Sequence, residues 1–151
     1  MRDPQDIRAL VQLRLAEAQV LADNRHPAGA FYLAGYSVEL LLKAKVAERM
    51  GLPWLFDEKI PPGEQFNGLS ELRKLVKTHN LVLLLVMAGL KTVYVQRQQD
   101  EPAFFKYRQL LESWNEGLRY QLPAADNEAN TQRFLNFLTG PDGFLQWIEQ
   151  N

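Results

Sequence analysis

Four polar side chains fall on one stripe of a predicted helix that is otherwise apolar. They lie in the segment FYLAGYSVELLLKAK, at spacings of four, three and four residues: Tyr32, Tyr36, Glu39 and Lys43. These spacings align side chains along one face of an α-helix. Val38 and the leucines at 40–42 leave little room for a solvated face. The stripe is therefore either a satisfied structural network or a binding site.

Glu39 decides between these two interpretations, because a buried carboxylate needs a partner. Removing one partner of a buried ion pair costs roughly 3–5 kcal/mol. The sequence offers Arg14, which interrupts the apolar stripe of the first predicted helix, and Arg119. On a solvated face, Glu39 and Lys43 would instead form a weak i,i+4 pair. We expect a structural network, to which Arg14 contributes, with a binding site as the alternative.

Two further groups of residues could do chemistry. In ESWNEGLRYQLP, at residues 112–123, Arg119 beside Tyr120 could hold a phosphate or a base, or pair with Glu39. Trp114 in the same segment is expected to anchor the core. The two histidines, His26 and His79, have no glutamate three residues before them, and the chain has no cysteine. We therefore expect neither a metal site nor a bound cofactor.

The elements that must position these residues are helical, because no segment alternates with period two for long enough to form a strand. The helix signals are apolar spacing, proline starts, polar caps and glycine stops. They predict helices at about 4–23, 27–50, 78–98, 102–117 and 126–139, with a short helical turn at 70–77 and an amphipathic tail at 144–150. Asp3 and Thr78 are the expected N-caps. We predict an all-α up-and-down bundle of four or five helices, with a long loop at 52–68.

Length and composition indicate a single domain over residues 1–151. The chain is 46% hydrophobic and 23% charged, with a formal net charge of −1. This balance is typical of globular proteins and gives no overall basic field for nucleic acid or anionic membranes. The first ten residues contain no apolar signal-peptide segment, and the apolar stretch at 81–90 is too short to cross a bilayer. We expect a cytoplasmic protein without membrane association.

Three segments, in order, resemble the HEPN domain family. They are FYLAGYSVELLLKAKVAERMG, KTHNLVLLLVMAGL and ESWNEGLRYQ, within about Ala28 to Gln121. The resemblance implies a helical bundle that commonly dimerises and often partners a minimal nucleotidyltransferase. It also implies that Tyr36, Glu39 and Lys43 lie on the signature helix. We expect the stripe to form a polar pocket inside the bundle with Arg119 and Tyr120, for a nucleotide, a partner or the fold alone.

Some HEPN branches are ribonucleases that carry an Arg-x(4–6)-His motif on a late helix. There the arginine positions the phosphate and the histidine acts in acid–base chemistry. The late arginines at 108, 119 and 133 have no histidine within reach. One literal match, Arg73 with His79, precedes the third helix, where His79 is otherwise expected to satisfy backbone groups. The resemblance therefore favours a protein that is not an enzyme.

Three functions follow, in order of preference. The first is a non-catalytic, dimeric interaction module that partners a nucleotidyltransferase or belongs to a toxin–antitoxin or defence system. The second is a nucleotide- or RNA-binding protein that uses the Tyr/Glu/Lys stripe with Arg119 and Tyr120. The third is a ribonuclease that uses Arg73 and His79. The small residues Ala28, Ala30, Ala34 and Gly35 in the first half of the second predicted helix could bring two copies together.

Overall fold

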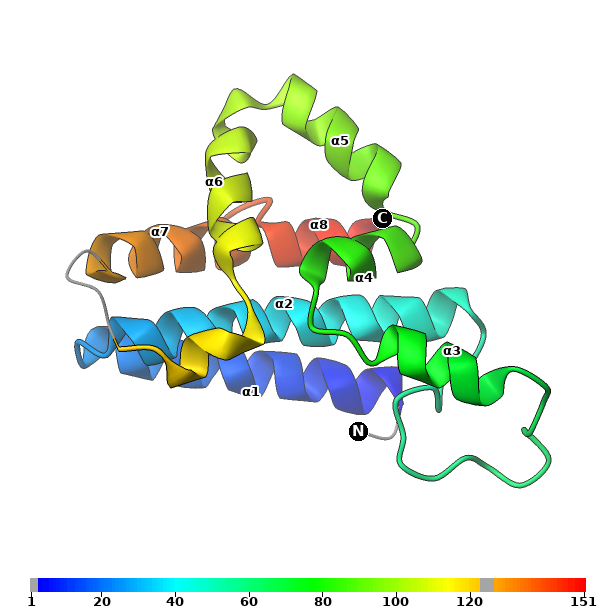
Figure 1. Ribbon diagram of the computed structural model, residues 1–151. Helices are drawn as coiled ribbons and strands as arrows, with labels where there is room; N and C mark the ends of the chain where they lie inside the picture. Colours follow the sequence, from blue (N-terminus) through cyan, green and yellow to red (C-terminus); the bar gives the residue numbers. More distant parts are fainter. Residues whose placement is uncertain (1–2, 123–126) are drawn as a thin grey trace.

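The computed structural model describes residues 3–122 and 127–151, and these residues form helices without any strand (Figure 1). The helices are α1 (Pro4–Asp23), α2 (Pro27–Arg49), α3 (Leu69–Val76), α4 (Leu81–Met87), α5 (Lys91–Asp100), α6 (Pro102–Ser113), the 3-10 helix η1 (Glu116–Tyr120), α7 (Asn127–Thr139) and α8 (Phe144–Gln150). The prediction of an all-α chain is confirmed for these residues. The helix start expected near residue 126 lies outside them.

The first two helices begin and end almost where the sequence predicts. The Asp3 side chain accepts hydrogen bonds from the backbone N–H groups of Gln5 and Asp6, both at 2.8 Å. These bonds satisfy two of the donors left free at a helix start. Proline at the first helical position begins both α1 and α2.

Helix α2 is the centre of the fold. It contacts α1 along its length and also touches α4, α7, α8 and η1, so it is enclosed on most sides (Figure 1). This enclosure explains why its sequence is apolar almost all the way round. The same enclosure buries part of its polar stripe.

The third predicted helix, 78–98, is wrong as a single element. The chain forms α4 and α5 instead, which meet at an angle of 114°. Gly89 lies between them at φ +69°, a left-handed conformation that glycine adopts without steric cost. Asn80 rather than Thr78 caps α4, because its side chain accepts a hydrogen bond from the Leu83 N–H at 3.0 Å.

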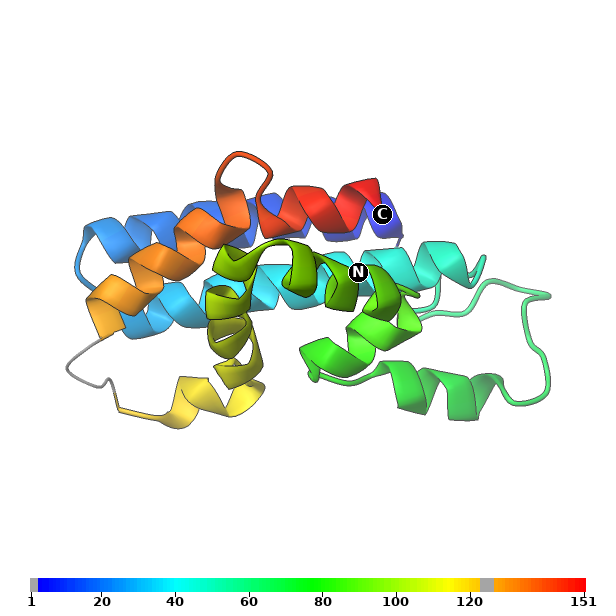
Figure 2. The same cartoon turned by 90° about the horizontal axis from the view of Figure 1, so that it is seen from above.

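Helices α5 and α6 form a V above the bundle, and α6 leads back down to α2 (Figures 1 and 2). Helices α7 and α8 cover another side of α2 and contribute the buried rings of Phe134 and Phe144. The long connection at 52–68 is present as predicted. It is tied to the core by three buried side chains, Trp54, Leu55 and Phe56. The resemblance to an up-and-down HEPN bundle of four or five helices stays a prediction.

In the described ranges, no single helix is long and apolar enough to cross a bilayer. Helices α4 and α5 satisfy the criteria only as a pair, across their sharp bend.

Candidate functional site

The polar stripe of α2 divides into a surface half and an interior half. Tyr32 and Tyr36 are half-buried, whereas Glu39 is 0% exposed and Lys43 is 6% exposed. Burial, followed by the charge of Glu39, raises the pKa of the Tyr36 phenol. The four residues therefore share a helix face, as the spacing predicts, but only the two tyrosines reach the surface.

The buried carboxylate of Glu39 binds two cation-forming side chains. Lys43 donates to Oε1 at 2.5 Å from one turn further along α2. The Nδ1 atom of His79 lies 2.9 Å from Oε2 and 3.1 Å from Oε1. Because an unpaired buried charge is strongly destabilising, these contacts make the burial of Glu39 possible.

Neither partner suggested by the sequence contacts Glu39. Arg14 forms an ion pair with Glu17 at 2.7 Å on the same helix. Arg119 is exposed and lies over the ring of Tyr120, with its guanidinium carbon 4.9 Å from the ring centroid. Those two expectations are wrong, because each arginine has a closer partner near its own place in the chain.

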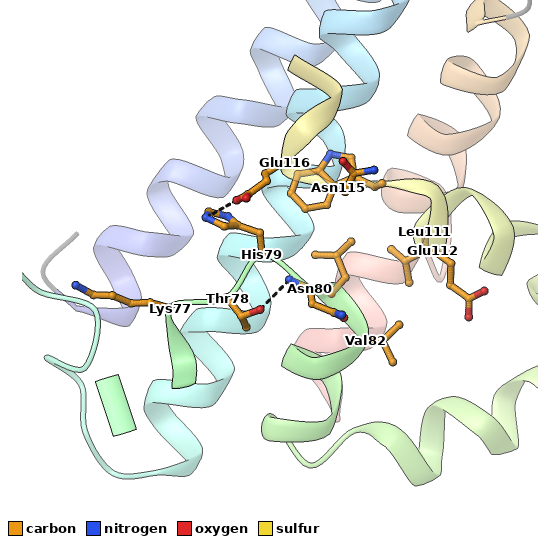
Figure 3. Close-up of a pocket in the computed structure, with 11 residues that line it drawn as sticks. Lys77, Thr78, His79, Asn80, Val82, Leu111, Glu112, Asn115 and Glu116 are labelled. Atoms are coloured by element: carbon orange, nitrogen blue, oxygen red, sulfur yellow. Dashed lines mark hydrogen bonds and ion pairs between the residues drawn. The ribbon is translucent and has the colours of Figure 1, made fainter. Parts of the chain in front are cut away.

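His79 connects the interior network to the surface. It stands in the segment between α3 and α4, and its Nε2 atom lies 2.7 Å from Glu116 Oε2 in η1 (Figure 3). Both side chains are 46% exposed, in contrast to Glu39. The expectation that His79 satisfies backbone groups is wrong, because each ring nitrogen faces a carboxylate.

A pocket of about 580 Å³ opens beside this bridge. Its walls are the segment 77–82 and the end of α6 with the start of η1, including Glu112, Trp114 and Asn115 (Figure 3). The volume falls in the range of small-molecule sites. The wall carries both signs of charge, with Lys77 on one side and two glutamates on the other.

Trp114 fixes the connection between α6 and η1 to α2. Its indole N–H donates to the Tyr32 carbonyl at 2.9 Å, and its ring stacks on that of Tyr32 with centroids 6.0 Å apart. The buried indole lies directly against Gly35, so the expected anchoring role fits its position. Ala30 and Ala34 are fully buried in the same chain. Ala30, Ala34 and Gly35 therefore pack within one chain and are not free to form the dimer contact suggested by the sequence, whereas Ala28 is half-buried.

An aromatic surface continues from Trp114. Tyr32 and Tyr36 stack with centroids 6.4 Å apart, and Tyr120 is 80% exposed. Charge interaction with Tyr120, and then with Tyr32, raises the pKa of the Arg119 guanidinium. This surface is an exposed cation among aromatic rings, a combination that can stack a base and hold a phosphate.

The structure does not bring Arg73 and His79 together as a catalytic pair. Arg73 donates to the backbone carbonyl of Asp57 in the long connection, whereas His79 faces two glutamates. In the part of the chain that the structure describes, no cluster of three or more histidine, aspartate or glutamate residues could hold a metal ion.

Glu116 is the site residue that sequence reasoning missed. It is an ordinary glutamate at the start of a short 3-10 turn, and only its distance to His79 reveals its role.

Comparisons with family models, curated proteins and solved structures return no match for this chain. The assignment of the candidate site is therefore supported by the geometry of its residues alone.

Proposed function

We propose that the protein is a non-catalytic interaction module of the HEPN type that works as a dimer. By its resemblance to the HEPN family, it would partner a minimal nucleotidyltransferase or serve in a toxin–antitoxin or defence system. The observation that carries the interaction role is the outer face of α4. The state of the candidate catalytic groups supports the non-catalytic part.

Helix α4 contains no charged residue and exposes several large apolar side chains. Its sequence is LVLLLVM, and Val82, Leu83 and Val86 are 43%, 39% and 45% exposed, whereas Leu81, Leu84 and Leu85 are buried. Contiguous exposed apolar surface marks contact sites on soluble proteins. A second copy is the occupant that we propose, because an uncharged face that meets itself across a two-fold axis leaves no charge unpaired.

The groups that could perform acid–base chemistry already have partners within the chain. Both ring nitrogens of His79 face carboxylates, and Arg73 is engaged by the Asp57 carbonyl. A general base must be free to reach the proton that it removes. This state favours an interaction role over the ribonuclease alternative. RNA cleavage by the pure protein that is lost in His79→Ala would reverse that preference.

Oxidative crosslinking tests the α4 contact directly, because the chain contains no cysteine. Val86→Cys should give a disulfide-linked dimer when oxidised at micromolar concentration. The matched control is Val20→Cys on α1, since Val20 is 60% exposed on another helix. Equal crosslinking of the two variants, or none in Val86→Cys, would contradict the proposed contact.

The second candidate function is binding of a nucleotide or RNA at the aromatic surface. The observation in its favour is the stacked pair Tyr32 and Tyr36 beside the exposed Arg119. A ligand at 100 times its dissociation constant adds about 2.7 kcal/mol to stability, which a melting curve detects readily. The shift should disappear in Arg119→Ala. A panel of nucleotides and short RNAs that leaves the melting temperature unchanged would remove this candidate.

A further inference from the structure

The imidazole of His79 is bounded by one carboxylate on each nitrogen. Nδ1 faces the buried Glu39 at 2.9 Å. Nε2 faces Glu116 at 2.7 Å, the contact that Figure 3 draws. Carboxylate oxygens only accept hydrogen bonds, whereas a neutral imidazole donates from one nitrogen alone. Both contacts therefore require one additional proton, either as the second proton of the ring or as a proton on Glu116 shared with Nε2.

We propose that this bridge is a proton-dependent clasp that holds η1 against α2, and that loss of the proton releases η1 at Glu116. The device is independent of the function proposed above. It is a property of the folded chain alone, and it assigns a role to a polar bridge that links three separate parts of the sequence.

Glu116, rather than Glu39, is the partner that leaves. Glu39 is fully buried and would remain as a buried charge with Lys43 alone if the ring turned away. If the remaining N–H stays on Nδ1, Glu39 keeps its hydrogen bond from His79. The lone pair of Nε2 would then face a carboxylate oxygen at 2.7 Å, so two acceptors would repel each other. Because Glu116 is 46% exposed, water can replace its contact.

Every element around the ring contributes charged groups to this balance. Helix α2 supplies Glu39 and Lys43, and η1 supplies Glu116. The segment before α4 supplies Lys77, which lines the same pocket. The end of α6 supplies Glu112, whose carboxylate is paired with Arg108 at 2.6 Å. Of the two contacts of the His79 ring, the one with Glu116 joins two half-exposed groups, whereas Glu39 is fully buried, so protons in solution reach the Glu116 contact more easily.

Release should be confined to the segment around η1. Trp114 stays fixed to α2 through its hydrogen bond to the Tyr32 carbonyl, so it forms the fixed end of the movement. The moving part begins at Glu116, and its movement is limited by Leu118, whose side chain packs against the core. The departure of the moving part would widen the pocket beside His79, of which Glu116 is one wall.

Nuclear magnetic resonance of the isotope-labelled chain tests the clasp. As the pH rises, the backbone amide signals of Gly117 and Leu118 should shift with the same midpoint as the His79 ring. Each pH unit above that midpoint should raise the ratio of released to clasped chains about tenfold, as for any one-proton step. His26 is the only other histidine, and His26→Asn should leave the coupled shift unchanged.

Glu116→Gln is the decisive variant. A glutamine amide can accept from a charged ring or donate to a neutral one, so η1 should stay in place at every pH. The Gly117 and Leu118 shifts should then no longer follow the signals of the His79 ring. The proposal is overturned if these amides do not follow His79 in the unmodified chain, or if they follow it equally in Glu116→Gln.

Discussion

The indole of Trp114 lies against the bare backbone of Gly35, and a β-carbon at residue 35 would overlap the indole ring. This contact joins the end of α6 to the centre of α2 across 79 residues of sequence. Because the indole N–H also donates to the carbonyl of Tyr32, the position of η1 beside the polar stripe depends on it. The glycine is therefore required by packing and not by backbone conformation.

Gly35→Ala should destabilise the fold. Forcing additional atoms into a well-packed core costs roughly 1–3 kcal/mol, and here the atom in the way belongs to a rigid indole. Gly29→Ala on the same helix is the matched control, because its β-carbon would meet only the flexible end of Leu21. Urea unfolding should show a clear loss for Gly35→Ala and a change within about 1 kcal/mol for Gly29→Ala. Equal effects would argue against the close packing of Trp114.

Lys43→Met should also be costly, because it keeps the length of the side chain but leaves Glu39 with one donor fewer. Breaking a buried pair costs roughly 3–5 kcal/mol, and His79 should hold the loss near the lower end. Lys45→Met is the control, since Lys45 on the same helix donates to the exposed carbonyl of Glu149. That variant should lose about 1 kcal/mol or less. If both variants unfold at the same urea concentration, the Glu39 network does not stabilise the fold.

The local signals of the sequence predict the first half of the chain well. Asp3 with Pro4, and Pro27 with Gly51, mark the ends of α1 and α2 because caps and prolines act through neighbouring residues. Such features need no knowledge of the rest of the fold. The spacing of Glu39 and Lys43 permits a contact one turn apart, but the sequence assigned that pair to a solvated face, whereas the pair is buried.

Features set by distant residues could not be predicted in this way. Gly89 stands in a long apolar run, where a single glycine is compatible with a continuous helix. Only the packing of α4 against α2 shows that the chain turns there. The contact between His79 and Glu39 spans 40 residues, and no local pattern marks it. The arginines at 14 and 119 were the wrong partners for Glu39, because Arg14 pairs with Glu17 and Arg119 lies over the ring of Tyr120.

Acid should weaken the ion pairs of Arg8 that join α1 to α2 and α8. Arg8 binds Glu48 at 2.6 Å and Glu149 at 2.6 Å, which ties α1, α2 and α8 together. The hydrogen bonds from Arg8 lower the pKa of Glu48 below its ordinary 4.5. Because the folded-state pKa is the lower one, this contribution is complete above pH 4.5 and is lost as the pH falls through the folded value.

Urea unfolding at a series of pH values checks this dependence. The unmodified chain should be more stable than Glu48→Gln above pH 4.5, and the difference should shrink towards zero in stronger acid. A difference that stays constant from neutral pH into acid would show that ionisation of Glu48 does not contribute.

We propose that α4 provides the contact between two copies, and the mass in solution tests this contact most directly. Sedimentation equilibrium of the unmodified chain should give twice the mass of one chain, and Val86→Glu should give the mass of a single chain. Val20→Glu, a matched exposed valine on α1, should remain dimeric. Both glutamates replace exposed side chains, so each should change the stability of a single copy by about 0.5 kcal/mol or less. A single-chain mass for the unmodified protein at high concentration, or a dimer that survives in Val86→Glu, would contradict the account.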